Sequence, residues 1–136
     1  MIKGMAHVCL LAKDLDAAER FYCNGLGLKK TFDFISDGRV VGFYLQLSQG
    51  VFIEIFERAE IAIHADNPIQ HFCIEVDDID QIGERLIGNG YEATKKMLGA
   101  DHSWQLWTTD PSGARIEFHQ YTDRSTQITR ENCFLK

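Results

Sequence analysis

The chain has 136 residues, 45% of them hydrophobic and 25% charged, with a formal net charge of −6. This length suits one compact domain with a sizeable core and leaves too little chain for two ordinary domains. The acidic balance and the lack of a basic cluster argue against nucleic acid as a partner. No apolar run approaches the length that crosses a membrane, so we expect no membrane association.

The cysteines are scattered and none belongs to a Cys-x-x-Cys pair; they are Cys9, Cys23, Cys73 and Cys133. The first residues run directly into an alternating apolar segment, so we expect no secretory signal. Without such a signal, scattered cysteines are expected to be free thiols rather than disulfides. This predicts a cytoplasmic protein.

The first half of the chain predicts a strand, a helix and three further strands. Residues 5–12 alternate as a half-buried strand does. Asp14 can cap a helix that continues to about residue 24. Turn residues then separate three strands, expected near 28–36, 39–48 and 51–58.

The second half predicts the same order. A strand near 69–76 precedes a helix that Asp78 opens and that ends near residue 88. The remaining strands are expected near 91–98, 103–109 and 114–121. The polar tail, about 122–136, is expected to be loosely ordered as far as Phe134.

An internal repeat accounts for this recurrence. His7-Val8-Cys9-Leu10 is matched 64 residues later by His71-Phe72-Cys73-Ile74, and 51–56 is matched 63 residues later by 114–119. We therefore expect a single domain with repeat 1 at about 1–58, a linker at about 59–68 and repeat 2 at about 69–121. The predicted fold class is α+β, with two βαβββ repeats that form a curved mixed sheet around a metal-binding cup.

Two histidines and two glutamates occupy matched positions of the repeats. Side chains alternate across a strand, and in each of these strands the apolar set marks the face toward the helix. That phasing turns four polar residues toward the cup: His7, Glu54, His71 and Glu117. A carboxylate within an apolar strand is costly unless it is paired or bound to a metal. Two imidazoles and two carboxylates suit one divalent ion such as Ni²⁺, Zn²⁺, Co²⁺, Mn²⁺ or Fe²⁺.

A plainer interpretation applies to each of these residues alone. A strand glutamate commonly faces solvent, and a single strand histidine is more often a satisfied core residue. Four such residues at matched positions of two repeats form a much more specific pattern.

The sequence resembles the vicinal oxygen chelate superfamily, which includes glyoxalase I, bleomycin resistance proteins and extradiol dioxygenases. The resemblance extends to about residue 121 and is carried by the two His segments above, by 14–22 with Gly25-Leu26-Gly27-Leu28, and by 110–118. The ligand order His, Glu, His, Glu is that of glyoxalase I. It implies a metal-dependent lyase or isomerase of the lactoylglutathione lyase type, which removes a proton alpha to a carbonyl through a metal-stabilised enediolate. It nominates Glu117 as the base and Glu54 as its counterpart.

The glutathione-binding residues of glyoxalase I are not matched. Leu11 and Arg58 stand at the corresponding positions, and a buried leucine cannot bind a carboxylate, which argues against glutathione. The side chains expected to line the substrate site are Arg58, Gln105, Arg115 and His119.

Two other functions remain open on this fold. An Fe(II) extradiol-type dioxygenase would use His7, His71 and Glu117, although Glu54 argues against it because that chemistry needs open positions for O₂ and substrate. A small-molecule binding or resistance protein would use the cup without turnover.

The resemblance also implies a homodimer. Small two-module members usually exchange modules, so His7 and Glu54 of one chain would meet His71 and Glu117 of the other in a two-fold dimer. A linker of about ten residues reaches roughly 35 Å, which permits shared sites as well as a site within one chain.

Overall fold

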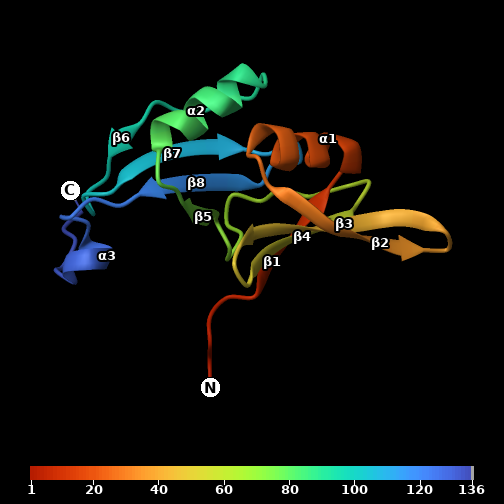
Figure 1. Cartoon of the computed structure of the whole chain (residues 1–136), viewed down its shortest axis with the longest axis horizontal. Coiled ribbons are helices and arrows are strands. Elements are labelled where there is room, and N and C mark those ends of the chain that lie inside the picture. The colour runs from red at the N-terminus through yellow and green to blue at the C-terminus, as the bar shows by residue number, and fades with distance from the viewer. Residues whose placement is uncertain (136) are drawn as a thin grey trace. The chain divides into compact units, whose positions relative to one another are not determined.

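The computed structural model describes residues 1–135, which fall into two compact units. Unit 1 comprises Met1–Ile63 with Pro111–Gly113, and unit 2 comprises His64–Asp110 with the described residues from Ala114 on. Each unit contains one open four-stranded sheet and a helix on one of its faces (Figure 1). The predicted α+β class with two βαβββ repeats is confirmed.

Unit 1 follows the predicted order closely. Its elements are β1 (His7–Ala12), α1 (Leu15–Glu19), the π-helical turn η1 (Arg20–Gly25), β2 (Lys29–Ser36), β3 (Arg39–Ser48) and β4 (Val51–Glu57). The sheet order is β1-β4-β3-β2, with β1 parallel to β4 and the other neighbours antiparallel. The carboxylate of Asp14 caps α1 by accepting a hydrogen bond from the Ala17 amide at 3.0 Å.

The core of unit 1 lies between its sheet and the α1–η1 segment. The side chains that are buried almost completely here are Phe21, Tyr22, Phe43, Leu45, Ile53 and Ile55. Burial of each stabilises the fold by roughly 1.5–3 kcal/mol. Because side chains alternate along β4, burial of Ile53 and Ile55 on this face leaves Glu54 on the other.

Unit 2 repeats this arrangement with a shorter sheet. Its elements are β5 (Phe72–Glu75), α2 (Ile79–Gly88), β6 (Met97–Leu98), β7 (Trp104–Thr109), β8 (Arg115–Gln120) and α3 (Thr126–Thr129). The sheet order is β5-β8-β7-β6, again with a parallel first pair. Asp78 caps α2 as Asp14 caps α1, through a 3.0 Å hydrogen bond from the Gln81 amide. Gly90 follows α2 with a φ of +83°, a conformation that favours glycine.

Three predicted elements differ in the structure. The helix expected over 14–24 changes register at Arg20 and ends as a π turn, in which the Leu26 amide bonds to the Phe21 carbonyl at 3.0 Å. The strand expected over 91–98 shrinks to β6, because 91–96 meets β7 through isolated bonds, such as the Trp107 amide to Thr94 Oγ1, rather than a ladder. The strand expected over 69–76 is limited to β5.

The tail is more ordered than expected. It contains α3, and the fully buried Ser125 accepts a hydrogen bond from Ser103 Oγ at 3.0 Å. None of the helices within residues 1–135 is long and apolar enough to cross a membrane.

Candidate metal centre

The first His–Glu pair lies on the two parallel strands of unit 1. His7 begins β1, and Glu54 lies at the centre of β4, opposite Cys9 in the register. His7 Nε2 is 3.9 Å from Glu54 Oε1, while His7 Nδ1 is 3.1 Å from the hydroxyl of Tyr44. An Nδ1–H that donates to this hydroxyl leaves Nε2 with its lone pair toward Glu54, the tautomer that binds a metal.

The second pair occupies the same place in unit 2. His71 lies one residue before β5, and Glu117 lies in β8, opposite Cys73 in the register. His71 Nε2 is 3.1 Å from Glu117 Oε2, and the side-chain exposure is 35% for the histidine and 8% for the glutamate. The rings of Trp107 and His71 meet in a T-shaped contact, with ring centroids 4.7 Å apart.

An aromatic residue supports each pair, and the sequence patterns did not single it out. Tyr44 faces Glu54 across β3 and β4, and Trp107 faces Glu117 across β7 and β8. Each ring also contacts the histidine of its own unit. The signal in the sequence is that both aromatics precede their glutamate by ten residues. Each carboxylate therefore lies between a cysteine on one neighbouring strand and an aromatic ring on the other.

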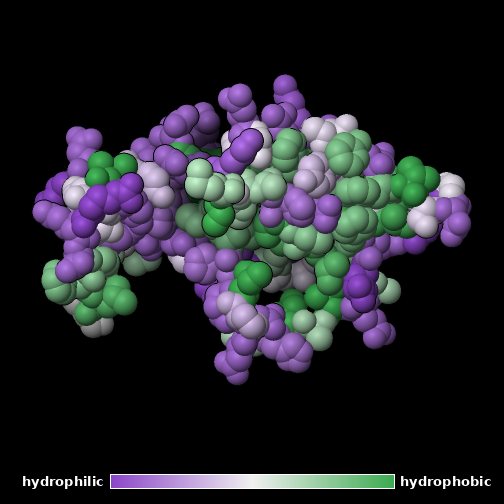
Figure 2. Space-filling model, turned by 90° about the horizontal axis from the view of Figure 1, so that it is seen from below, coloured by the Kyte–Doolittle hydropathy of each residue, from purple (hydrophilic) through white to green (hydrophobic). Residues whose placement is uncertain are grey.

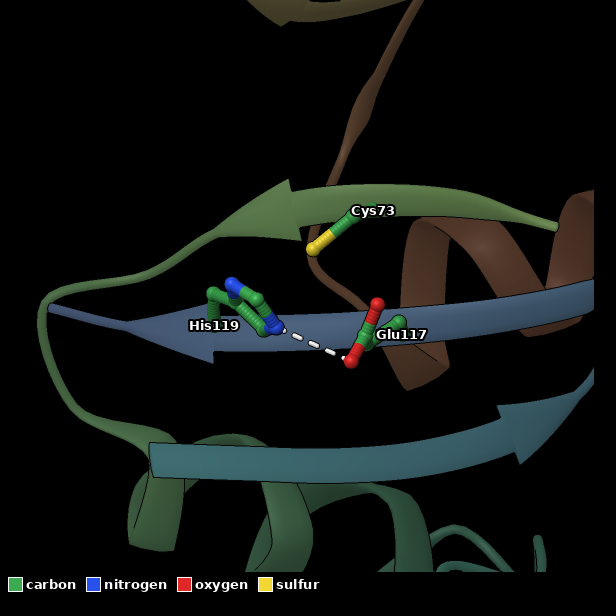
Figure 3. A group of neighbouring side chains, drawn as sticks. All are labelled: Cys73, Glu117 and His119. Carbon is green, nitrogen blue, oxygen red and sulfur yellow. Dashed lines mark hydrogen bonds and ion pairs between the residues drawn. The ribbon is translucent and has the colours of Figure 1, made fainter. Parts of the chain in front are cut away.

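Within residues 1–135, Glu117 has a second histidine partner and Glu54 has none. His119 Nε2 is 2.9 Å from Glu117 Oε1, and both residues are buried. Phe56 takes the corresponding place beside Glu54 on β4. Cys73 completes the group around Glu117, as Figure 3 shows. Burial, and then the charge of Glu117, raise the pKa of the Cys73 thiol to about 12.

The Cys9 thiol is in a similar but more open setting. Burial, followed by a hydrogen bond with Glu54, raises its pKa above the ordinary value. All four cysteines are free thiols, as predicted.

The four predicted donors fit a divalent ion chemically. Two ligands of one ion at about 2.1 Å lie roughly 3–3.4 Å apart, which the second pair matches at 3.1 Å and the first approaches at 3.9 Å. Taken as a whole residue, Glu117 is only 6% exposed, and its partners are two histidines and a thiol. A bound cation would balance the charge of this buried carboxylate. Each pair lies within one unit. The structure brings His7 together with Glu54 in unit 1, and His71 together with Glu117 in unit 2.

The predicted substrate residues lie in different settings. Arg58 is exposed just after β4, and the Arg115 guanidinium lies over the Trp107 ring at 5.0 Å. Gln105 is half-buried on β7, where it pairs with His119 across the sheet. His119 itself lies against Glu117, in the interior.

Leu11 corrects one expectation. It is 38% exposed rather than buried, because it shares the face of β1 that also exposes His7 and Cys9. An exposed leucine still offers no donor to a carboxylate, so the argument against glutathione is unaffected.

Five aromatic side chains cover the face of the unit 1 sheet that carries Glu54. This aromatic face consists of Phe32, Phe34, Tyr44, Phe52 and Phe56. The stacked pairs have ring centroids 4.6–5.0 Å apart. Figure 2, which views the molecule from the side away from α1, shows apolar side chains gathered over the β2–β3 strands. Phe52 and Phe56 share this face with Glu54 through the alternation of β4, whereas the other three rings come from β2 and β3.

Solved structures of similar proteins share the fold. A glyoxylase/bleomycin resistance protein/dioxygenase domain from Frankia sp. EAN1pec has a TM-score of 0.77 and 22% identity, over 90% of this chain and 100% of that one. A lactoylglutathione lyase from Agrobacterium tumefaciens has a TM-score of 0.66 and 23% identity, over 88% and 94%. TnmS3, an antibiotic binding protein from Streptomyces sp. CB03234, has a TM-score of 0.70 and 16% identity, over 89% and 98%.

At these identities the likeness shows the fold alone. No curated protein matches the chain. The family model described as the Glyoxalase/Bleomycin resistance protein/Dioxygenase superfamily matches residues 4–118, most of the sequence. The chain, with its two βαβββ repeats and matched His–Glu pairs, therefore belongs to the Glyoxalase/Bleomycin resistance protein/Dioxygenase superfamily.

Proposed function

We propose that the protein is a metal-dependent lyase or isomerase of the glyoxalase type, which holds one divalent ion per site. Its ligands are His7, Glu54, His71 and Glu117. The observation that carries this proposal is the matched His–Glu pair in both repeats, each with a cysteine and an aromatic ring beside its glutamate. An ion pair that only stabilised the fold would not need to recur in both repeats with the same cysteine and aromatic neighbours.

The chemistry proposed for this site is proton abstraction alpha to a carbonyl. The bound ion supplies Lewis-acid stabilisation of the negative charge that develops as the proton leaves. Glu117 accepts the proton at a carboxylate oxygen, and its two histidine contacts, at 3.1 Å and 2.9 Å, hold both oxygens in place. Glu54 contacts His7 and serves as the counterpart ligand.

The substrate side is assigned to Arg58, Gln105, Arg115 and His119. Arg115 has the clearest support, because its exposed guanidinium lies over Trp107, which also contacts His71. A guanidinium held in this way can bind an anionic group of the substrate. Leu11 argues against glutathione, so the proposed substrates are other small hydroxy-carbonyl compounds or thioesters.

Metal analysis and isotope exchange test the proposal together. Protein purified without chelators should contain close to one divalent ion per chain. Exchange of the proton alpha to the carbonyl, followed by NMR across a panel of small hydroxy-carbonyl compounds, should occur with the wild type and be abolished by Glu117→Gln. Full exchange in that variant would remove Glu117 as the base. Strong O₂ uptake with catechols after anaerobic iron loading would favour the dioxygenase instead.

A binding protein without turnover is the second candidate, and the aromatic face favours it. Stacked rings beside His7 and Glu54 offer a surface for a flat, apolar molecule. If purified protein holds no metal, and His7→Ala leaves the affinity for such a ligand unchanged, this function replaces the enzyme.

The proposed assembly is a homodimer with shared sites in a cytoplasmic protein. Superfamily membership and the distribution of the two ligand pairs over two units support the dimer. The free thiols support the location.

A further inference from the structure

Unit 2 contains a set of metal donors that is complete without any residue of the first repeat. The ligand atoms of Cys73, Glu117 and His119 all lie within 4.8 Å of one another. His71 Nε2 approaches the same carboxylate at 3.1 Å. We propose that these four residues form a thiolate-containing site for a soft divalent ion of the Zn²⁺ or Cd²⁺ class. His71 and Glu117 also belong to the centre proposed above, so the two sites are alternatives for one ion. The present site needs neither His7 nor Glu54, so it does not rest on the proposed function.

The parallel pairing of β5 and β8 creates this arrangement. Cys73 lies opposite Glu117 in the register, and His119 follows Glu117 by two residues, so all three side chains are on one face. Figure 3 shows the sulfur on one strand and the carboxylate and imidazole on the other, directed toward a common space. Donor atoms of a tetrahedral zinc ion lie about 3.3–3.8 Å apart, so shifts of about 1 Å would close the site.

A second carboxylate supports His119 from behind. His119 Nδ1 is 4.0 Å from Asp101 Oδ2 on the side opposite Glu117. Asp101 is itself held by the Gln127 side-chain amide at 2.7 Å and by the Ser103 backbone amide at 3.1 Å. Metal-binding histidines commonly have this arrangement, in which the other ring nitrogen faces a fixed carboxylate.

Unit 1 lacks the same set and offers an internal comparison. Cys9 and Glu54 match Cys73 and Glu117, but Phe56 stands where His119 would complete the group. Within residues 1–135, the close Cys, Glu and His donor group lies in unit 2.

The donor chemistry determines the class of ion. A thiolate with two imidazoles and a carboxylate is softer than the two-His, two-Glu set, and it favours Zn²⁺ and Cd²⁺ over Mn²⁺, Mg²⁺ or Ca²⁺. The Cys73 thiol must lose its proton to solvent when the metal–sulfur bond forms.

Cadmium titration of the full chain tests the site through ultraviolet absorbance from charge transfer between thiolate and metal. The wild type should gain one such band that saturates at one ion per chain. Cys73→Ser should lose the band, whereas Cys9→Ser, the matched control in repeat 1, should keep it. His119→Phe, which copies the phenylalanine of repeat 1, should weaken cadmium binding by at least about tenfold. Asp101→Asn should weaken it less, because Asp101 is 4.0 Å from the His119 ring.

A measurement on the unmodified protein guards against a variant that fails to fold. Bound Zn²⁺ should slow the alkylation of Cys73 by iodoacetamide at least about tenfold, mapped by peptide mass spectrometry, and should leave Cys9 unprotected. A missing band in the wild type, a band that survives Cys73→Ser, or equal protection of both cysteines would overturn the inference.

His7→Ala separates this site from the proposed function. If the band persists in this variant, unit 2 binds the ion by itself. If metal binds without a thiolate band and is lost with His7→Ala, the four-ligand centre stands and the present inference fails.

Discussion

Replacement of Glu117 by glutamine should remove most of the stability that a bound metal ion gives to the folded protein. An ion that binds only the folded protein stabilises it by about 2.7 kcal/mol when its concentration is a hundredfold above Kd. For 136 residues, an unfolding entropy of about 2.1 cal/mol/K per residue amounts to roughly 0.29 kcal/mol/K. Cooperative unfolding of the whole chain should then show a Tm increase of about 9 °C on metal addition.

The glutamine variant should lose most of this increase. Glu117 contacts two histidines, at 3.1 Å and 2.9 Å, and is the most buried of the four predicted ligands. If its removal weakens metal binding a hundredfold, the same metal concentration contributes only about 0.4 kcal/mol, or about 1–2 °C. Without metal, the variant should unfold within about 1 kcal/mol of the wild type. The amide oxygen still accepts a hydrogen bond, and a buried charge is removed.

Differential scanning calorimetry with and without Ni²⁺, Zn²⁺ or Co²⁺ measures both effects. Glu84→Gln removes an exposed carboxylate on α2 and serves as the control, which should retain the full metal response. A full Tm increase in Glu117→Gln would refute the reasoning, as would a wild type that responds to none of these ions.

Three further outcomes follow from the same structure. Refolding a mixture of His7→Ala and Glu117→Gln chains should restore part of the proton exchange, because one site of a mixed shared-site dimer carries both changes and the other carries none; no recovery in proven heterodimers would place each site within one chain. Asp78→Ala should lower the free energy of unfolding by about 1 kcal/mol in urea titrations, because it leaves the Gln81 amide without its cap, and an unchanged midpoint would contradict this. Gly42→Ala should destabilise the protein by more than about 2 kcal/mol, because the added Cβ meets the backbone oxygen of Ile55, and an unchanged Tm would show that β3 and β4 can separate there.

The sequence alone determined the two repeats, because their signals are local. Asp14 and Asp78 each stand just before an apolar helical stripe, and both carboxylates cap the helix amide three residues later. Alternation in β4 and β8 has a fixed period of two, so burial of Ile53 and Ile116 also fixed the face that carries the neighbouring glutamate.

The surroundings of each glutamate needed the tertiary structure. Strand register decides which residue of a neighbouring strand faces Glu54 or Glu117, and no local pattern shows that Tyr44 and Trp107 do so. The contact of Cys73 with Glu117 depends in the same way on the parallel pairing of β5 with β8.

The elements that were mispredicted also depended on distant contacts. Residues 91–96 alternate well enough for a strand, but a strand also needs a continuous ladder of hydrogen bonds to a neighbour. On this side of β7, the ladder covers Met97 and Leu98, which form β6. The polar tail was predicted to be loosely ordered because its own residues show no apolar pattern. Its anchor is a buried contact of Ser125 with Ser103, 22 residues away in the chain. Composition reports how much apolar surface a segment can bury, whereas tertiary packing decides which polar groups find a partner there.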